Sequence, residues 1–159
     1  MLRFRFTFSI LCAVVVSAAH GQTLNEPVTG RVLKVLPQLL DKQGRHTVSP
    51  SLFDRDAYQA QLRANPSEVS GIRYEVNWKA RGTEFQQLTI RVELRGLFED
   101  KIPRLKTLET TVPGKASMRE WTSLKLTGEE YIDFGSITAW RATLWCEETL
   151  LDEYTSFLW

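Results

Sequence analysis

The side chains that could carry out catalysis are few and far apart in the chain. The 159-residue sequence has two histidines, His20 and His46, and two cysteines, Cys12 and Cys146. His20 and Cys12 lie in the first 21 residues, which have the pattern of a cleaved leader, so His46 and Cys146 are the pair that remains. A serine or cysteine nucleophile needs a neighbouring base, and one His and one Cys far apart in the chain make no zinc site. The sequence has no Gly-x-Ser-x-Gly motif and no glycine-rich phosphate loop. We therefore expect a non-enzyme, with no catalytic, cofactor-binding or metal-binding residues.

Acidic pairs give little further indication of chemistry. Glu129-Glu130 and Glu147-Glu148 are paired carboxylates of the kind used in glycoside hydrolysis. Each pair falls in a predicted turn, where charge serves solubility. Asp54 and Asp56 are separated by a cation and lack the glycine of a calcium loop, so they fit the start of a helix better.

The tryptophans suggest a binding surface instead. Trp140 and Trp145 lie at odd spacing in one predicted strand, so they point to opposite faces. Trp145 then shares its outer face with Arg141 and Thr143. An exposed indole beside an arginine is a platform for stacking a sugar or a protein. The alternative, which the need to cover both sheets favours, is that the N-terminal segment or the helix covers Trp145.

The first 21 residues have the pattern of a secretory signal peptide. Arg3 and Arg5 precede an apolar stretch, Phe6–Ala19, and cleavage-site patterns of small residues lie at Ser17-Ala18-Ala19 and Ala19-His20-Gly21. The stretch is shorter than the ~20 residues that a membrane-spanning helix needs. We expect export to the periplasm or beyond, with no stable membrane insertion after signal removal. An uncleaved N-terminal anchor is the alternative.

The charge and composition fit one globular domain. The sequence has 20 Lys and Arg against 19 Asp and Glu, and 43% of its residues are hydrophobic. Loss of Arg3 and Arg5 with the signal leaves 18 − 19 = −1. This balance argues against nucleic acid as a partner. Cys146 is then the only thiol, so the core and not a disulfide must hold the domain together.

Residues 51–64 form the clearest predicted helix. Ser51 is a suitable N-cap, Asp54 favours the first turn, and Asn65-Pro66 ends the helix. The apolar residues that share one predicted face are Phe53, Ala57, Ala60 and Ala64, with Tyr58 and Leu62 beside them.

Two later segments alternate between apolar and polar residues, which is typical of strands with one buried face. Residues 72–78 and 88–94 follow this pattern, and the glycine between them predicts a long antiparallel hairpin. The other predicted elements are a tether at 22–30, strands at 31–40 (bent or at an edge at Pro37), 105–112 and 120–126, and a final hairpin of 137–146 with 150–159.

About seven short strands and one early helix predict a mainly β fold. The strand count and spacing favour an antiparallel immunoglobulin-like β-sandwich, formed as a single domain by residues 31–159. The segment Leu126-Thr-Gly-Glu-Glu-Tyr131 resembles the stretch before strand F of immunoglobulin-like and fibronectin-type domains. This resemblance implies a corner role for Tyr131. The proline that the family has beside the glycine, and the intersheet cysteine pair of antibody domains, are missing.

A broader resemblance covers most of the mature chain. Residues 49–59, 138–145 and 156–159 resemble small exported bacterial proteins of unassigned function, which implies no activity. The favoured hypothesis is an exported, non-catalytic binding or assembly module for an unknown protein or glycan. The alternatives are a carbohydrate-binding module or small carbohydrate-active protein, and an envelope-associated structural protein.

Overall fold

The computed structural model describes residues 27–84, 86–99, 101–115 and 117–159. The predicted signal peptide, residues 1–21, and residues 22–26 of the predicted tether lie outside this range. The elements are β1 (Thr29–Asp41), α1 (Leu52–Ala64), the 3-10 turn η1 (Pro66–Glu68), β2 (Val69–Arg81), β3 (Gln87–Phe98), β4 (Ile102–Pro113), β5 (Ser117–Thr127), α2 (Glu129–Phe134), β6 (Ser136–Cys146) and β7 (Thr149–Thr155).

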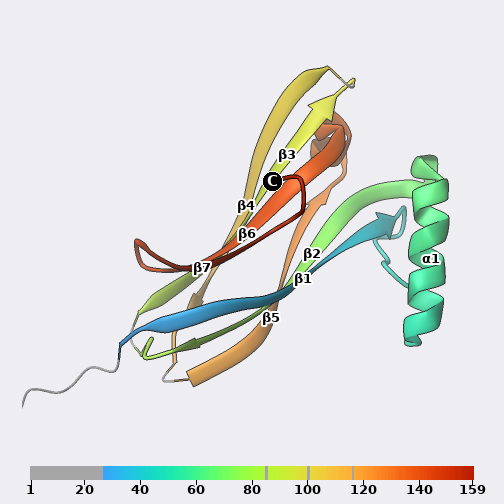
Figure 1. Ribbon diagram of the computed structural model, residues 1–159. Coiled ribbons are helices and arrows are strands. Elements are labelled where there is room, and N and C mark those ends of the chain that lie inside the picture. Colours follow the sequence, from blue (N-terminus) through green and yellow to red (C-terminus); the bar gives the residue numbers. More distant parts are fainter. Residues whose placement is uncertain (1–26, 85, 100, 116) are drawn as a thin grey trace, which may run out of the picture.

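The strands form two antiparallel sheets with a shared core between them (Figure 1). One sheet has the order β1-β2-β5 and the other has the order β4-β3-β6-β7. This confirms the predicted mainly β fold with seven antiparallel strands. The sheets lie close together near the start of β1, where the Val32 N–H donates to Asp152 Oδ2 at 2.8 Å, and they diverge toward α1.

The alternating segments supply the core, as predicted, but they do not pair with each other. Strand β2 pairs with β1 and β5, whereas β3 pairs with β4 and β6, so the predicted hairpin is wrong. Alternation fixes which face is buried and says nothing of the neighbouring strand; here the two apolar faces meet across the core. The buried residues on these faces are Ile72, Tyr74, Val76, Trp78, Leu88, Ile90, Val92 and Leu94.

The first strand is an edge strand, as predicted from Pro37. It begins at Thr29, so the last two residues of the predicted tether belong to the sheet. Its bulges lie between Val32 and Lys34 and next to Asp41, and not at the proline. An edge position tolerates a proline because its missing N–H breaks no bond to a second neighbour.

Helix α1 begins and ends as predicted but buries a different face. The Ser51 side chain accepts from the Asp54 N–H, which confirms the cap. Phe53 is 81% exposed, whereas Gln59 and Leu62 are buried. The reason is a polar anchor that hydropathy does not reveal: the Gln59 amide accepts from the Leu39 N–H at 2.8 Å and donates to the Leu39 carbonyl at 2.9 Å.

The predicted corner residue, Tyr131, lies in α2 and not at the start of a strand. This short helix follows Gly128, which has a φ of 64°, and places Phe134 in the core. Gly96 of β3 leaves room for the Phe134 ring, because a Cβ at Gly96 would lie 2.5 Å from it. The final hairpin is confirmed, although β7 ends at Thr155 instead of continuing to the last residue.

The carboxylate of Asp41 connects the end of β1 to the following turn and to α1. Its Oδ1 accepts from the backbone N–H groups of Gln43 and Arg45, at 2.9 and 2.8 Å. Its Oδ2 accepts from the Arg45 guanidinium at 2.8 Å and from the Tyr58 hydroxyl at 2.6 Å. Burial alone would raise the pKa of Asp41, but the hydrogen bonds from Tyr58, Arg45 and Gln43 outweigh it and lower that pKa to about 2.

We predict an acid-dependent contribution of Asp41 to stability. Its pKa is lower in the folded than in the unfolded chain, so the contribution is complete above about pH 5 and is lost as the pH falls toward about 2. Urea unfolding of the wild type and of Asp41→Asn across this range measures it. The difference in free energy of unfolding should be constant near neutral pH and should shrink below about pH 4. A difference that does not depend on pH would contradict the prediction.

Candidate functional site

The three residues predicted as a binding surface lie together on the outer face of β6. The Trp145 N–H donates to Thr143 Oγ1 at 2.9 Å, and the Arg91 guanidinium lies 5.4 Å from the centre of the Trp145 ring. Trp145 is partly buried and Thr143 is 2% exposed. Helix α1 does not cover Trp145, because it packs against β1 in the other sheet (Figure 1). The alternative cover, by the N-terminal segment, involves residues before Pro27, which lie outside the described residues. Within the described part of the chain, Arg91 of the neighbouring strand lies over the Trp145 ring.

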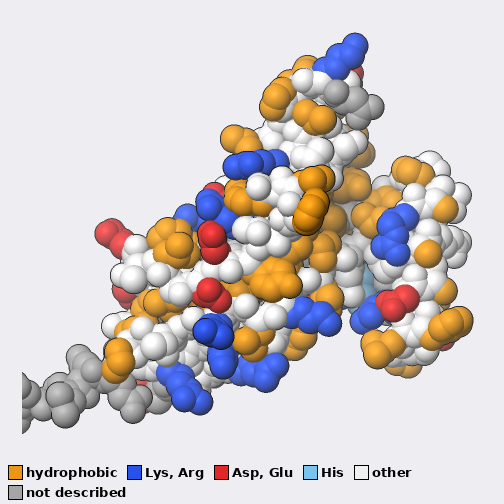
Figure 2. All heavy atoms as spheres, viewed as in Figure 1, with side chains coloured by type: hydrophobic (Ala, Val, Ile, Leu, Met, Phe, Trp, Pro, Cys, Tyr) orange, Lys and Arg blue, Asp and Glu red, His pale blue; other side chains and the backbone are white. Residues whose placement is uncertain are grey.

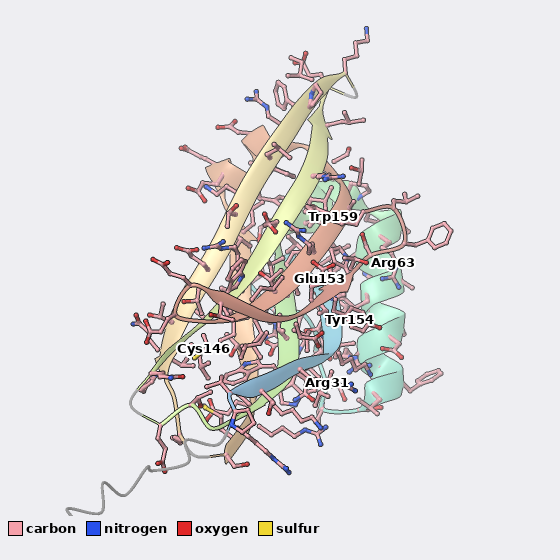
Figure 3. All side chains as sticks on the ribbon, turned by 60° about the vertical axis from the view of Figure 1, so that its left-hand side comes forward. Arg31, Arg63, Cys146, Glu153, Tyr154 and Trp159 are labelled. Carbon is pink, nitrogen blue, oxygen red and sulfur yellow. The ribbon has the colours of Figure 1, made fainter. Side chains whose placement is uncertain are left out.

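Arg141, the third predicted residue, is held by its own neighbours. Its guanidinium donates to Glu93 at 2.7 Å and lies 3.5 Å from the Glu153 carboxylate. The hydrogen bond to Glu93 raises the pKa of Arg141, so it remains charged. Its guanidinium also lies 5.0 Å from the centre of the Trp159 ring, and that of Arg95 lies 3.9 Å from the same ring. Figure 3 labels Trp159 and Glu153, which Arg141 contacts. The predicted surface is therefore a layer of side chains that satisfy one another.

A surface that the sequence analysis missed lies on the outer face of the three-stranded sheet. Strand register places Arg31 opposite Lys79, and Lys79 opposite Arg119. These three exposed side chains form a row across the sheet, which we call the cation row, with neighbouring backbones about 4.8 Å apart. Arg81 and Lys34 follow in the rows on either side. We call these five residues the cationic face.

The cationic face has no carboxylate to neutralise it. Among the described residues, none of its five cations lies within 4.0 Å of an Asp or Glu oxygen. Among the described residues that face outward on β1, β2 and β5 away from α1, the acidic residue is Glu75, which pairs with Arg73 at 3.0 Å. Figure 2 shows Lys and Arg side chains gathered along the lower edge of the molecule, where β1, β2 and β5 lie in Figure 1.

Two further residues complete this surface. Asn77 is buried between the strands, and its side-chain oxygen accepts from the Arg119 guanidinium at 3.2 Å, which orients that cation. Trp121 lies opposite Asn77, in the row next to Arg119, and is 52% exposed. At the end of the sheet, Arg31, Lys79 and Arg81 also line an open depression of about 560 Å³ beside the start of β7.

This arrangement of like charges opposes folding. Like charges directly opposite each other on neighbouring strands are destabilising. The other sheet avoids this cost by placing Arg91 opposite Glu109 and Glu93 opposite Arg141. The cation row is thus suited to bind an anion, because a bound negative group offsets the repulsion between its three positive side chains.

The remaining reactive groups form no second site in the described part of the chain. The His46 ring makes no hydrogen bond to a described residue, and burial lowers its pKa. Cys146 is buried, and burial raises the pKa of its thiol, which favours the unreactive protonated form. Among the described residues, no three His, Cys, Asp or Glu side chains are grouped as metal ligands.

Comparison with known proteins supports the fold alone. No protein-family model and no curated protein matches the chain. The structure is similar to the crystal structure of a protein from Akkermansia muciniphila, with a TM-score of 0.50 and 12% sequence identity. The match covers 86% of this chain and 75% of the other. A likeness at this identity shows a shared arrangement of strands and carries no function.

We predict that Trp145→Ala destabilises the protein. The indole loses its contacts with Arg91 and Thr143, and truncation of a partly buried tryptophan should lower the free energy of unfolding by about 1–3 kcal/mol. Trp121→Ala is the matched control on the other sheet, and its effect should stay within about 0.5 kcal/mol. Urea unfolding at neutral pH measures both variants. Equal stability of the wild type and Trp145→Ala would show that the ring is not a packing residue.

Proposed function

We propose that the protein is an exported, non-catalytic binding module that uses the cationic face to bind a negatively charged partner. The observation that carries this proposal is the row formed by Arg31, Lys79 and Arg119, which lie opposite one another without a carboxylate between them. Such a row concentrates positive potential and both attracts and orients an anionic ligand. The net charge of the whole chain gives no sign of it, because the acidic residues lie elsewhere.

Export is supported by the signal-peptide pattern of residues 1–21. Among the described residues, no helix is long and apolar enough to cross a membrane. The proposal agrees with the binding module that the sequence favours. It places the binding surface on the cationic face of the three-stranded sheet and not at Trp145.

The finer fold assignment is also a proposal. We propose an immunoglobulin-like architecture, in which β1, β2 and β5 correspond to strands A, B and E, and β4, β3, β6 and β7 correspond to C′, C, F and G. The strand order is compatible with this assignment. In such domains, binding commonly uses loops or a sheet face supported by a rigid two-sheet core. The cationic face has that support, because the core residues Trp78 and Ala80 flank Lys79 along β2.

Charge removal tests the proposal. We predict that Arg31→Gln/Lys79→Gln/Arg119→Gln weakens binding to polyglutamate, a polyanion without sugar rings, by roughly tenfold or more at low salt. The control, Arg63→Gln/Lys101→Gln/Arg104→Gln, removes the same charge from exposed positions outside the cationic face and should bind about as the wild type does. Binding of the wild type should also weaken as salt is added.

Isothermal titration calorimetry measures these affinities, and circular dichroism checks that both variants are folded. The proposal is wrong if the wild type does not bind polyglutamate at low salt. It is also wrong if the two triple variants lose affinity equally, because attraction would then depend on total charge and not on the row.

A further inference from the structure

We infer that the ligand of the cationic face is an acidic polysaccharide, with one sugar ring stacked on Trp121 and its carboxylate groups bound by the cation row. This inference rests on the proposed function and adds the chemical class of the ligand. It starts from a difference between Trp121 and the other four tryptophans.

Each of the other tryptophans has a partner within the protein. The Trp78 N–H donates to Thr122 at 2.8 Å. The Trp140 ring stacks on Tyr154, with ring centres 6.2 Å apart. Trp145 and Trp159 lie under arginine guanidinium groups.

Trp121 is the exception among the described residues. It takes part in no aromatic pair, no cation–π contact and no side-chain hydrogen bond there. It is 52% exposed on β5, an edge strand, so a ligand can approach its ring from the open side of the sheet. An exposed indole without a partner is a surface to which the apolar face of a sugar ring can bind.

The neighbours of Trp121 determine the charge of that sugar. Arg119 lies two residues before it on the same face, at a distance of about 6.8 Å along the strand. A guanidinium binds a carboxylate through two parallel hydrogen bonds, which favours a planar acidic group beside the stacked ring. Lys79 and Arg31 extend the row by about 10 Å across the sheet. A row of this length fits a polymer with repeated charges better than a single small anion.

The same face is poorly suited to a membrane or to nucleic acid. Away from α1, the apolar side chains that strand register places on this face are Trp121 and the partly buried Leu36, whereas a protein that lies on a membrane inserts a broad apolar surface. Proteins that bind single-stranded nucleic acid stack successive bases on several aromatic rings. Among the described residues, the outer face of β1, β2 and β5 has one aromatic ring.

The test compares ligands that share charge and differ in their rings. Affinities for the wild-type chain and for Trp121→Ala are measured by calorimetry with polygalacturonate, with polyglutamate of matched charge and length, and with uncharged dextran. We expect polygalacturonate to bind roughly tenfold more tightly than polyglutamate, and dextran not to bind. Trp121→Ala should bind polygalacturonate no more tightly than polyglutamate, and its affinity for polyglutamate should be nearly that of the wild type. Trp121→Phe should restore part of the preference for polygalacturonate.

The outcomes separate the two proposals. If polyglutamate binding depends on the cation row while Trp121→Ala leaves polygalacturonate binding unchanged, the proposed function stands and the polysaccharide inference is wrong. Tighter binding to phosphatidylglycerol vesicles or to a single-stranded DNA oligonucleotide than to polygalacturonate would also overturn the inference. If the wild type does not bind polyglutamate at low salt, the proposed function itself is wrong.

Discussion

The register of β2 between β1 and β5 is the constraint on which the core and the cationic face both depend. Trp78, Tyr74 and Val76 are buried on one side of β2, so their alternate neighbours must point to the other side. A slip of one residue would expose these side chains and turn Lys79 into the core. The free energy of core burial therefore also holds the cation row in place, because the same register sets both faces.

The two outer faces show that repulsion between like charges on neighbouring strands is not a general property of the fold. On the four-stranded sheet, Arg141 lies between two glutamates. The guanidinium groups of Arg91 and Arg95 lie over the rings of Trp145 and Trp159. On the three-stranded sheet, Arg31 and Arg119 flank Lys79 without such partners in the described structure. The same chain thus neutralises one face internally and leaves the other available for an external anion.

The sequence could predict what depends on local spacing. The alternation around Tyr74 and Ile90 revealed their buried faces, and Ser51 revealed the start of the helix, because each signal lies within a few residues. Strand neighbours depend on contacts between distant segments, so the pairing of β2 was predicted wrongly. For the same reason the sequence could not show that Arg31, Lys79 and Arg119 lie side by side. The buried face of α1 was missed because the polar residue Gln59, and not an apolar stripe, anchors the helix.

The free energy of unfolding of Lys79→Gln tests the central claim most directly, because Lys79 faces a cation on both sides. If the row opposes folding, this variant should be more stable than the wild type by about 0.5 kcal/mol at low salt, and less so at high salt. Lys101→Gln, at an exposed turn, is the control and should not gain stability in this way. A loss of stability in Lys79→Gln, or a gain no larger than that of the control, would contradict the claim that the row is kept for a ligand at the expense of the fold.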